Sequence, residues 1–451
     1  MRVLLLAHRY PPHGRGGVET WTRTLAHALT RGGHVVAVAA RDDRDRSGLT
    51  PGEAATRPPF SRWEERESVG DDEVAVHWFV HRHDDARGYR STWDDPRFDD
   101  PIATLMAAFR PDVVHLAHPD GWGRRPLEVA RRAGLPTVVT LHDYKWICGR
   151  GQMIRPPGTA CSRVEESRCA RCLSDQLDRG PLRGTALRLL DRLGPGSSLR
   201  DRARTTDRRG VDQRRFPPAR AARRWRARQA GMLDALAGAD AVTSPSRFVA
   251  DRHRASGLDR PIDVVRQGMD GGAEDVARAP GPLRVGWFGN PLPTKGLGFL
   301  LRAAAALPPG SIEVHVHGAD SATVATEGVP DAPAVAHGAY PPEEAVRRMG
   351  TVDVVAIPSS WDENAPMVAL EARWAGRPLL VSDRGGLPEL VADDGWVEPL
   401  AAEAWAERLA LIAARPAAAA EAAARAPEPR TAARMADDYV AVYARVVGGA
   451  T

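Results

Sequence analysis

The chain has 451 residues, of which 43% are hydrophobic, and a formal net charge of +4. This length exceeds what one ordinary hydrophobic core accommodates and suits two domains, and the apolar content excludes an intrinsically disordered chain. No apolar run is long enough to cross a bilayer, and the first residues indicate a β-strand rather than a signal peptide. We therefore expect a soluble, cytoplasmic protein without a transmembrane segment.

The first half of the chain alternates between apolar strands and helices. It begins with a strand over Arg2–Ala7, a glycine-rich turn and a helix from about Val18 to Thr30. The next strands are expected at His34–Ala39, Glu73–Val80, Val113–Leu116 and Thr137–Leu141, with helices near Pro101–Phe109 and Pro126–Ala133. Runs of Val, Leu and Ile separated by helices are typical of a parallel sheet that is buried on both faces.

An insertion at about residues 145–230 interrupts this rhythm with a segment rich in Arg, Pro and Gly. Between Arg179 and Arg228 it holds 16 Arg against four Asp, a local excess of 12 positive charges. We favour a solvated helical surface; the alternatives are a docking surface for an anionic acceptor, for a phosphorylated carrier or for a membrane. No aromatic interleaving or nucleic-acid module accompanies these charges, so we expect no nucleic-acid partner.

A second series of strands and helices follows a Gly-, Ala- and Pro-rich linker at Gly271–Pro282. Before this linker the first series resumes with a strand at Ala241–Thr243, a helix from about Ser246 and a strand at Ile262–Val265. After it, strands are expected at Leu283–Phe288, Ile312–His317, Val352–Ile357 and Pro378–Ser382, and helices at Leu297–Leu307 and Pro366–Ala375.

This order predicts an α/β fold with a Rossmann-like domain over residues 1–275 and a second one over residues 282–430. A C-terminal helix over residues 431–451 would follow, and whether it packs back on the first domain stays open. In open parallel sheets a ligand binds outside the carboxyl ends of the strands, so the motifs at these ends are the candidates for function.

Three strand ends carry residues suited to binding a ligand. The segment Gly14–Glu19 (GRGGVE) joins the first strand to a helix, where glycines and free N–H groups favour a phosphate, although a tight turn explains it equally well. His142 and Asp143 end another strand, where packing alone seldom requires such a pair. Lys295 lies at a helix start, a position suited to a diphosphate, whereas a lone Lys is usually just solvated.

The most specific motif runs from Pro358 to Glu371 (PSSWDENAPMVALE). Glu363 follows a buried strand and Glu371 lies within the next helix, so the two carboxylates can reach different parts of one ligand. The backbone around Asn364 offers free N–H groups at the helix start, which suit a phosphate. A capped surface helix would explain Asn364 and Pro366 but neither glutamate.

Together these motifs resemble the retaining glycosyltransferases of family 4, which have the GT-B architecture of two facing Rossmann-like domains with a central cleft. The spacing of Glu363 and Glu371 matches the E-x7-E motif of that family. The resemblance covers nearly the whole chain through further segments: GGVE at Gly16–Glu19, the HD strand end at His142, SRF at Ser246–Phe248, QGMD at Gln267–Asp270, Lys295, and GG-x-PE at Gly385–Glu389.

The resemblance implies that His142, Lys295 and Glu363 are catalytic. It implies a set of donor-binding residues: Gly16, Gly17, Asn290, Gly318, Tyr340, Asn364, Ala365, Pro366, Met367, Val368 and Glu371. Glu371 would bind the ribose, and Gly318 and Tyr340 lie where relatives contact the base. Asn290 is a departure, because many relatives have Arg there; the charge is missing or is supplied by Arg384 or Arg15.

All four cysteines lie in one short stretch of the insertion: Cys148, Cys161, Cys169 and Cys172. A structural zinc bound by cysteines alone needs four thiolates close together, and a cytosolic chain is a poor setting for disulfides. The long gap between the first two differs from common zinc ribbons, so free thiols and an iron–sulfur cluster stay open beside the favoured structural zinc. The pair Asp43-x-Asp45 lies in a polar loop, and we expect no catalytic metal.

The resemblance implies transfer of a glycosyl group from a nucleoside-diphosphate sugar to a hydroxyl acceptor with retention of configuration. No nucleophile for a covalent intermediate is evident, which favours the front-face route. The acceptor, a small molecule, a glycan or a carrier-linked group, would bind the N-terminal domain, and peripheral contact with a membrane stays open. Two alternatives share the fold: a nucleotide-sugar 2-epimerase, and a non-catalytic nucleotide- or carbohydrate-binding protein.

Overall fold

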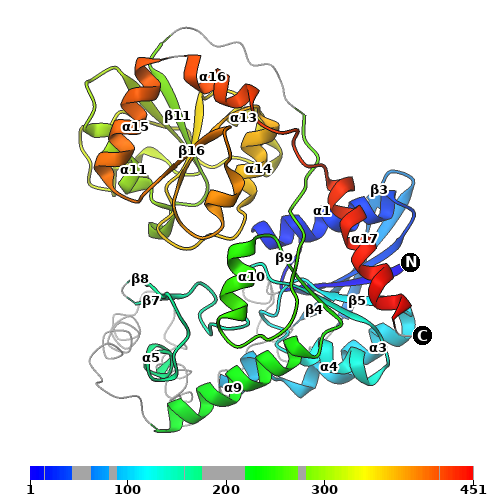
Figure 1. The fold of residues 1–451 in the computed structure, drawn as a ribbon. Coiled ribbons are helices and arrows are strands. Elements are labelled where there is room, and N and C mark those ends of the chain that lie inside the picture. The colour runs from blue at the N-terminus through cyan, green and yellow to red at the C-terminus, as the bar shows by residue number, and fades with distance from the viewer. Residues whose placement is uncertain are drawn as a thin grey trace, which may run out of the picture. The chain divides into compact units, whose positions relative to one another are not determined.

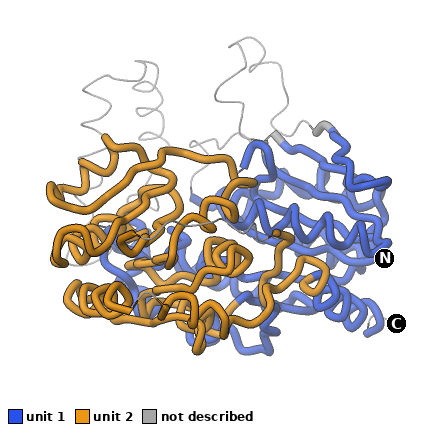
Figure 2. Tube along the Cα trace, turned by 90° about the horizontal axis from the view of Figure 1, so that it is seen from above, with its two compact units in different colours: residues 1–245, 249–265, 436–451 blue, residues 246–248, 266–435 orange. Residues whose placement is uncertain are grey.

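The computed structural model describes residues 1–14, 16–42, 62–80, 89–156, 158–174, 219–272, 281–415 and 417–449. The chain forms two compact units (Figure 1, Figure 2). Unit 1 comprises Met1–Pro245, Val249–Val265 and Ala436–Thr451, and unit 2 comprises Ser246–Phe248 and Arg266–Met435. Arg15, Asp43, Asp45 and most of the Arg-rich insertion, which were singled out from the sequence, lie outside the described residues.

Unit 1 is built on an eight-stranded sheet with the order β10-β9-β6-β5-β1-β2-β4-β3. The strands are β1 (Arg2–Ala7), β2 (Val35–Asp42), β3 (Arg62–Val69), β4 (Asp72–Val80), β5 (Val113–Leu116), β6 (Thr137–Thr140), β9 (Ala241–Ser244) and β10 (Asp263–Val264). Every pair is parallel except β3 with β4. The central strand β1 is buried from Val3 to Ala7, which explains its unbroken apolar sequence.

The helices α1 (Gly17–Arg31), α3 (Asp99–Phe109) and α4 (Arg125–Arg132) connect strands of this sheet. Helix α1 buries Trp21, Leu25 and Leu29, whose four-residue spacing places them on one face. The other helices that lie mainly in unit 1 are α5 (Glu166–Cys172), α9 (Ala219–Ala237), α10 (Arg247–Arg254) and α17 (Ala432–Gly448), and a short hairpin pairs β7 (Ile154–Arg155) with β8 (Thr159–Ala160).

Helix α17 completes the core of unit 1 from far along the chain. Its Tyr439 and Tyr443 are fully buried. The Tyr443 hydroxyl lies 2.7 Å from Nδ1 of His115, a strand residue 328 positions away, and Nε2 of that imidazole lies 2.8 Å from Oγ1 of Thr140. Tyr443 of this helix and Thr140 of β6 together provide a partner for both ring nitrogens of the buried His115, as buried polar groups require.

Unit 2 has a six-stranded parallel sheet with the order β13-β12-β11-β14-β15-β16. Its strands are β11 (Leu283–Phe288), β12 (Ile312–His317), β13 (Ala334–Ala336), β14 (Val354–Ile357), β15 (Leu379–Ser382) and β16 (Gly395–Glu398). Its helices are α11 (Leu297–Ala305), α12 (Ser321–Ala325), α13 (Ala345–Met349), α14 (Met367–Trp374), α15 (Ala402–Ala414) and α16 (Ala417–Ala424). Two apolar clusters, one containing Leu300 and Trp405 and the other Met349 and Ala372, bury its sheet.

The sequence pattern did not reveal β3, β13 and β16. Strand β3 has the sequence RWEERESV, which lacks an apolar run because it is an antiparallel edge strand. Strands β13 and β16 are the two edges of the sheet in unit 2; β13 has only three residues, and neither strand is buried like the four-residue central strands β14 and β15.

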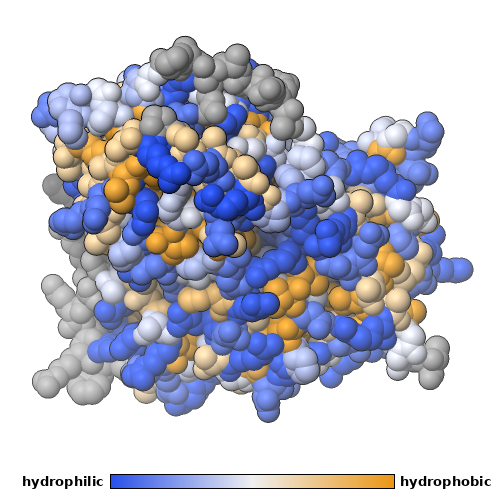
Figure 3. All heavy atoms as spheres, turned by 45° about the horizontal axis from the view of Figure 1, so that its top comes forward, coloured by the Kyte–Doolittle hydropathy of each residue, from blue (hydrophilic) through white to orange (hydrophobic). Residues whose placement is uncertain are grey.

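On the face drawn in Figure 3, hydrophilic side chains predominate and apolar ones form small patches. The most exposed large apolar side chains of the described residues, Leu411 and Val35, lie in different units. None of the described helices combines the length and the apolar character needed to cross a membrane.

Candidate functional site

The centre of the sheet in unit 2 is a topological switch point. From β11 the chain proceeds to β12 and β13 on one side, and from β14, the other neighbour of β11, it proceeds to β15 and β16. The loops that follow β11 and β14 therefore leave the sheet side by side, and a crevice at their position is where open α/β sheets bind ligands. The first loop carries Lys295 and the second carries Glu363.

The structure brings Lys295 and Glu363 together. The Lys295 ammonium lies 2.6 Å from Oε1 of Glu363, and the Ser359 hydroxyl donates a hydrogen bond of 2.8 Å to the same oxygen. The carboxylate side chain is 5% exposed and the lysine side chain 31% exposed. The ammonium also lies 5.6 Å from the ring centroid of Trp361. Glu363 is thus fixed within the protein, whereas Lys295 can still be approached from solvent.

Two glycines allow the loop of Glu363 to be held by its neighbours. The Gly386 N–H donates to the Glu363 carbonyl at 2.7 Å. Gly385 has φ +62°, and a Cβ there would lie 2.1 Å from that carbonyl oxygen. Only glycine fits such a close approach of two backbones in the left-handed region. The GG-x-PE segment therefore supports the loop that positions Glu363.

Glu389 of the same segment holds the SRF segment of unit 2. Its carboxylate accepts hydrogen bonds from the N–H groups of Arg247 at 3.0 Å and Phe248 at 2.7 Å, and from the Arg266 guanidinium at 2.7 Å. The Ser246 hydroxyl donates to Oδ1 of Asn364 at 2.6 Å. The motifs that are scattered along the sequence therefore form one hydrogen-bonded set around the Glu363 loop.

Helix α14 starts directly after this set. Pro366 is its N-cap and the helix begins at Met367, so the N–H groups of Met367 and Val368 point out of the first turn. Ala365 is buried, and Pro366 has no N–H to donate. Within the backbone segment expected to bind phosphate, Pro366 therefore offers no hydrogen-bond donor; it sets the backbone conformation at the start of the helix.

Glu371 lies in the second turn of α14 and is partly exposed. Burial raises the pKa of its carboxyl to about 7. Burial and then the Glu371 charge raise the pKa of Tyr340, so these two side chains lie near each other. Gly318 has φ +108°, and a Cβ there would lie 2.1 Å from the carbonyl oxygen of Gly289, so this position requires glycine for a close backbone approach.

Aromatic rings stack beside these residues. His317, at the end of β12, lies parallel to Phe288 at 4.5 Å and to His337 at 4.1 Å between ring centroids. Tyr340 meets Phe288 and His317 edge-on. His317 is 2% exposed, and burial lowers its pKa to about 3, so this imidazole is neutral. Gly318 and Tyr340 were expected at this site from the sequence, whereas the stacked rings of Phe288, His317 and His337 were not.

Asn290 follows the end of β11 and is exposed. Arg384, considered as a substitute for the missing charge, is 42% exposed and its Nε lies 3.4 Å from Oδ1 of Asp383. Its charge is therefore offset in part by that carboxylate.

Gly16 and Gly17 lie in unit 1, where α1 begins at Gly17 with Gly16 as its N-cap. A Cβ on Gly16 would lie 2.5 Å from Oε2 of Glu19, and one on Gly14 would lie 2.6 Å from Cγ of the same residue. The glycines therefore make room for the buried Glu19 side chain, which is 4% exposed. Its carboxylate accepts from His8, with Nε2 of the imidazole 3.2 Å from Oε1.

His142 and Asp143 lie in unit 1 directly after β6. Burial, followed by the nearby His118 and His115, lowers the pKa of His142 well below its usual value, so the ring is neutral. Its ring packs edge-on against Trp21 at 4.3 Å. The Asp143 carboxylate lies 3.2 Å from Nε2 of His118, which follows β5.

His8 and His118 were missed from the sequence. They follow β1 and β5, which are neighbours at the centre of the sheet in unit 1, and their ring centroids are 4.5 Å apart. A lone His after an apolar run is a weak signal, because the sequence does not show which strands are neighbours.

The rarity of lysine is a stronger sequence signal for polar sites in this chain. Of the 62 basic residues only Lys145 and Lys295 are lysines, and each forms an ion pair, with Asp120 and Glu363 respectively.

The four cysteines lie on the loop after His142 and Asp143, after the β7–β8 hairpin and on α5. They all line one cavity of about 30 Å³ in unit 1. Burial and the neighbouring thiols raise the pKa of Cys161 and that of Cys169, the latter to about 11. Among the described residues, which include all four cysteines, no group of three or more metal-ligating side chains is arranged to hold a metal ion.

Of the Arg-rich stretch between Arg179 and Arg228, residues 219–228 are described, as the first half of α9. Arg223 and Arg226 are exposed, and Arg226 pairs with Glu166 at 2.7 Å. Arg228, however, is 2% exposed and donates to the carbonyl oxygens of Lys145 and Trp146. This arginine belongs to the interior of unit 1 rather than to a charged surface, and it holds the loop that follows Asp143.

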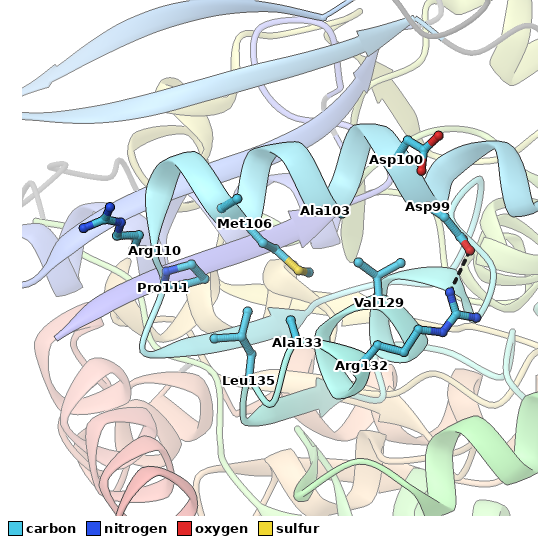
Figure 4. Close-up of a pocket in the computed structure, with 11 residues that line it drawn as sticks. Asp99, Asp100, Ala103, Met106, Arg110, Pro111, Val129, Arg132, Ala133 and Leu135 are labelled. Carbon is cyan, nitrogen blue, oxygen red and sulfur yellow. Dashed lines mark hydrogen bonds and ion pairs between the residues drawn. The ribbon is translucent and has the colours of Figure 1, made fainter.

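A larger cavity of about 530 Å³ lies between α3 and α4 of unit 1, lined by Met106, Val129 and Leu135 and flanked by Arg132, which pairs with Asp99 at 2.9 Å (Figure 4). None of the candidate residues lines it.

Each of the two units is matched by one family model. The model of glycosyltransferase family 4 matches residues 15–159, and that of glycosyl transferases group 1 matches residues 282–415. D-inositol 3-phosphate glycosyltransferases from Rhodococcus erythropolis and Rhodococcus opacus are both 33% identical, over 36% and 45% of this chain. The matches span 42% and 51% of those enzymes, so the chain aligns with about half the length of these relatives.

Solved structures share the fold over the whole chain. Sucrose-phosphate synthase from Thermosynechococcus elongatus has a TM-score of 0.64 and 16% identity, with 99% of each chain covered. Anabaena Alr3699/HepE in complex with UDP has a TM-score of 0.58 and 15% identity, with 99% of this chain and 100% of that chain covered. With its two Rossmann-like units and both family models matched, the chain belongs to glycosyltransferase family 4 and has the GT-B fold.

Proposed function

We propose that the protein transfers a glycosyl group from a nucleoside-diphosphate sugar to a hydroxyl acceptor with retention of anomeric configuration. The observation that carries this proposal is the ion pair of Lys295 and Glu363 at the switch point of unit 2, next to the first turn of α14. A cation and free N–H groups suit a diphosphate, and a buried carboxylate beside them suits the hydroxyls of a sugar. Structures of Alr3699/HepE hold UDP and UDP-glucose, which supports a donor of this class.

In the proposed reaction the leaving diphosphate gains negative charge as the glycosidic bond breaks. Lys295 and the N–H groups of Met367 and Val368 would stabilise this charge where it develops. Glu363 would orient the sugar, Glu371 would accept hydrogen bonds from the ribose, and Gly318 and Tyr340 would contact the base. The acceptor hydroxyl would attack from the face that the diphosphate leaves, and a phosphate oxygen would take its proton. Neutral His142 would hydrogen-bond the sugar.

A panel of nucleotide sugars and hydroxyl acceptors tests this function. We expect nucleotide release that depends on the acceptor, and a product whose anomeric configuration by NMR is that of the donor. An inverted product would contradict the retaining route. Isomerised donor without acceptor dependence would indicate an epimerase, and nucleotide binding without turnover would indicate a binding protein.

For the cysteines we propose a structural zinc. All four line one small cavity, which is the placement that a four-thiolate site requires, although the side chains as they stand are not in a ligating arrangement. We expect about one zinc per chain by elemental analysis, and a loss of that zinc in Cys169→Ser. Protein purified without chelators that contains neither zinc nor iron would show that these are free thiols.

A further inference from the structure

Unit 1 has an apolar groove that the donor and sugar contacts proposed above do not use. The groove has a volume of about 530 Å³ and lies between α3 and α4 (Figure 4). The buried Met106 and Val129 line it together with the exposed Ala103 and Ala107 of α3. Such a groove, with small side chains along one side, lets a second helix approach closely.

One face of α3 is exposed along the helix. Asp100, Ala103 and Ala107 lie on this face because they are spaced three and four residues apart. The opposite face carries Ile102 and Leu105, each of which is 1% exposed. Helix α3 is thus anchored in unit 1 by its apolar face and presents small side chains to solvent.

The two ends of the exposed face carry opposite charges. Asp100 lies in the first turn of α3, and Arg110 follows its last residue, roughly 15 Å further along the axis. Both side chains are exposed, and neither forms an ion pair with another described residue. Asp99 differs, since it pairs with Arg132 at 2.9 Å (Figure 4). Within the described part of the chain, the face therefore has an unpaired negative charge at one end and an unpaired positive charge at the other.

A second copy of α3, placed antiparallel to the first, matches these charges. A twofold axis near Leu105 places Asp100 of each copy opposite Arg110 of the other, so that one symmetry operation forms two ion pairs. Ala103 of one copy then lies opposite Ala107 of the other, where small side chains permit a close approach of the two helices. A parallel arrangement would place each charge beside its like and is therefore disfavoured.

We propose that the groove between α3 and α4 is the interface of a homodimer in which the two α3 helices lie antiparallel. The apolar groove supplies the buried area, and the exposed ion pairs set the orientation, since such pairs add little affinity. Helix α3 has 11 residues and α4 has 8, fewer than the roughly 20–30 residues on each side of a standard interface. We therefore expect a reversible dimer with a dissociation constant on the order of micromolar.

The dimer is independent of the proposed transfer reaction, because none of the residues proposed to bind the donor lines the groove. Sedimentation equilibrium of the full chain, at low salt and at concentrations from about 1 to 100 µM, therefore tests it without a substrate. The wild type should change from monomer to dimer over this range. A chain that stays monomeric at about 100 µM would overturn the proposal and leave the groove to a partner other than the chain itself.

Charge reversal then identifies the interface. Asp100→Arg and Arg110→Asp, each alone, should raise the dissociation constant at least about 10-fold, because the twofold axis makes each substitution bring like charges together twice. The double variant Asp100→Arg, Arg110→Asp exchanges the two charges and should return the dissociation constant to within about 3-fold of the wild-type value. Neither misfolding nor a different interface predicts this recovery.

Glu403→Arg is the matched control. Glu403 is an exposed acidic residue in the first turn of α15 in unit 2, so its reversal changes the charge at a helix start without altering the groove. It should leave the dissociation constant unchanged, and all these variants should unfold near the wild-type temperature because the substituted side chains are exposed. Single reversals that leave dimerisation unchanged, or a double variant that does not recover it, would contradict the antiparallel α3 interface.

Discussion

At the scale of single residues, composition makes the two lysines informative. In a chain whose other basic residues are all Arg, a Lys marks a place where a compact ammonium is used instead of a planar guanidinium. Lys295 meets a carboxylate that is itself held by Ser359, and its ammonium remains partly exposed. Such a cation can exchange its protein partner for a diphosphate without a large rearrangement.

Lys295→Ala should lower kcat by about 100- to 1000-fold, which corresponds to roughly 3–4 kcal/mol of lost transition-state stabilisation, by analogy with the loss of one oxyanion donor. Steady-state kinetics with the donor identified by the panel would measure this. Arg302→Ala, which removes an exposed cation from α11, is the matched control and should leave kcat unchanged. A Lys295→Ala protein with normal kcat and only a lower melting temperature would show that the lysine is structural.

Glu371 should make stability depend on pH. Its pKa of about 7 lies above the usual 4.5 because of burial, so the protonated form is favoured in the folded chain. The stabilising contribution is therefore complete below about pH 4.5 and is lost as the pH rises through about 7. Between pH 5 and pH 8 the free energy of unfolding should fall by roughly 1–2 kcal/mol more in the wild type than in Glu371→Gln, since each pKa unit corresponds to about 1.4 kcal/mol and the group is partly exposed.

Urea denaturation of both proteins at the two pH values gives this difference. Equal pH dependence in the wild type and in Glu371→Gln would mean that the carboxyl ionises normally in the folded chain. When nucleotide is bound, ionisation of Glu371 should instead stabilise the folded chain, because an ionised carboxylate accepts hydrogen bonds from ribose hydroxyls better than a protonated one.

At the scale of elements, the loops after β11 and β14 depend on glycines that admit a second backbone. Gly385 and Gly376 have the same φ of +62°, but a Cβ on Gly385 would meet the backbone of Glu363, while one on Gly376 would have no heavy atom within 4 Å. Alanine variants at these two positions therefore distinguish the effect of backbone strain from the effect of displacing the Glu363 loop.

Gly376→Ala should cost about 1–2 kcal/mol of stability from the left-handed conformation alone and leave activity intact. Gly385→Ala should carry the same strain and in addition displace the Glu363 loop, so that kcat/KM falls at least 10-fold. Thermal unfolding and steady-state kinetics of both variants measure the two effects. Equal kcat/KM in the two proteins would show that the GG-x-PE segment does not position Glu363.

The elements with strong patterns were those predictable from the sequence. Buried strands such as β1 and β14 show unbroken apolar runs, and the expected fold class is confirmed by the two parallel sheets and by the structural neighbours. Three of the four edge strands of the two large sheets, β3, β13 and β16, were not recognised because they are polar, short or not buried. Likewise, Lys295 and Glu363 stand in motifs, whereas His8 gains its meaning only from the pairing of β1 with β5, a non-local contact that no local pattern contains.

At the scale of the whole molecule, α17 joins the end of the described chain to the core of unit 1. Removing residues 436–451 would strip out Tyr439 and Tyr443, both fully buried. Each buried aromatic side chain contributes about 1.5–3 kcal/mol, and a typical domain has only about 5–15 kcal/mol of net stability. We therefore expect the truncated chain to lose the cooperative unfolding of unit 1 and to be cleaved there by limited proteolysis.

The double variant Tyr439→Phe, Tyr443→Phe is the matched control, since it keeps the rings and removes only the hydroxyls. It should remain folded with a loss of roughly 1–3 kcal/mol, the cost of leaving a buried partner such as His115 unsatisfied. A truncated chain that resists protease as well as the wild type would show that α17 is dispensable.

This arrangement has a consequence for synthesis on the ribosome. The strands of unit 1 emerge first, but their core stays incomplete until the residues around Tyr443 have been made, after the roughly 170 residues of unit 2. At about 5–20 residues per second this interval lasts roughly 10–35 s. While the second unit is being synthesised, the surface of β5 and β6 that α17 later covers stays exposed in the nascent first unit. Exposed apolar surface of this kind is prone to aggregation, which chaperones prevent.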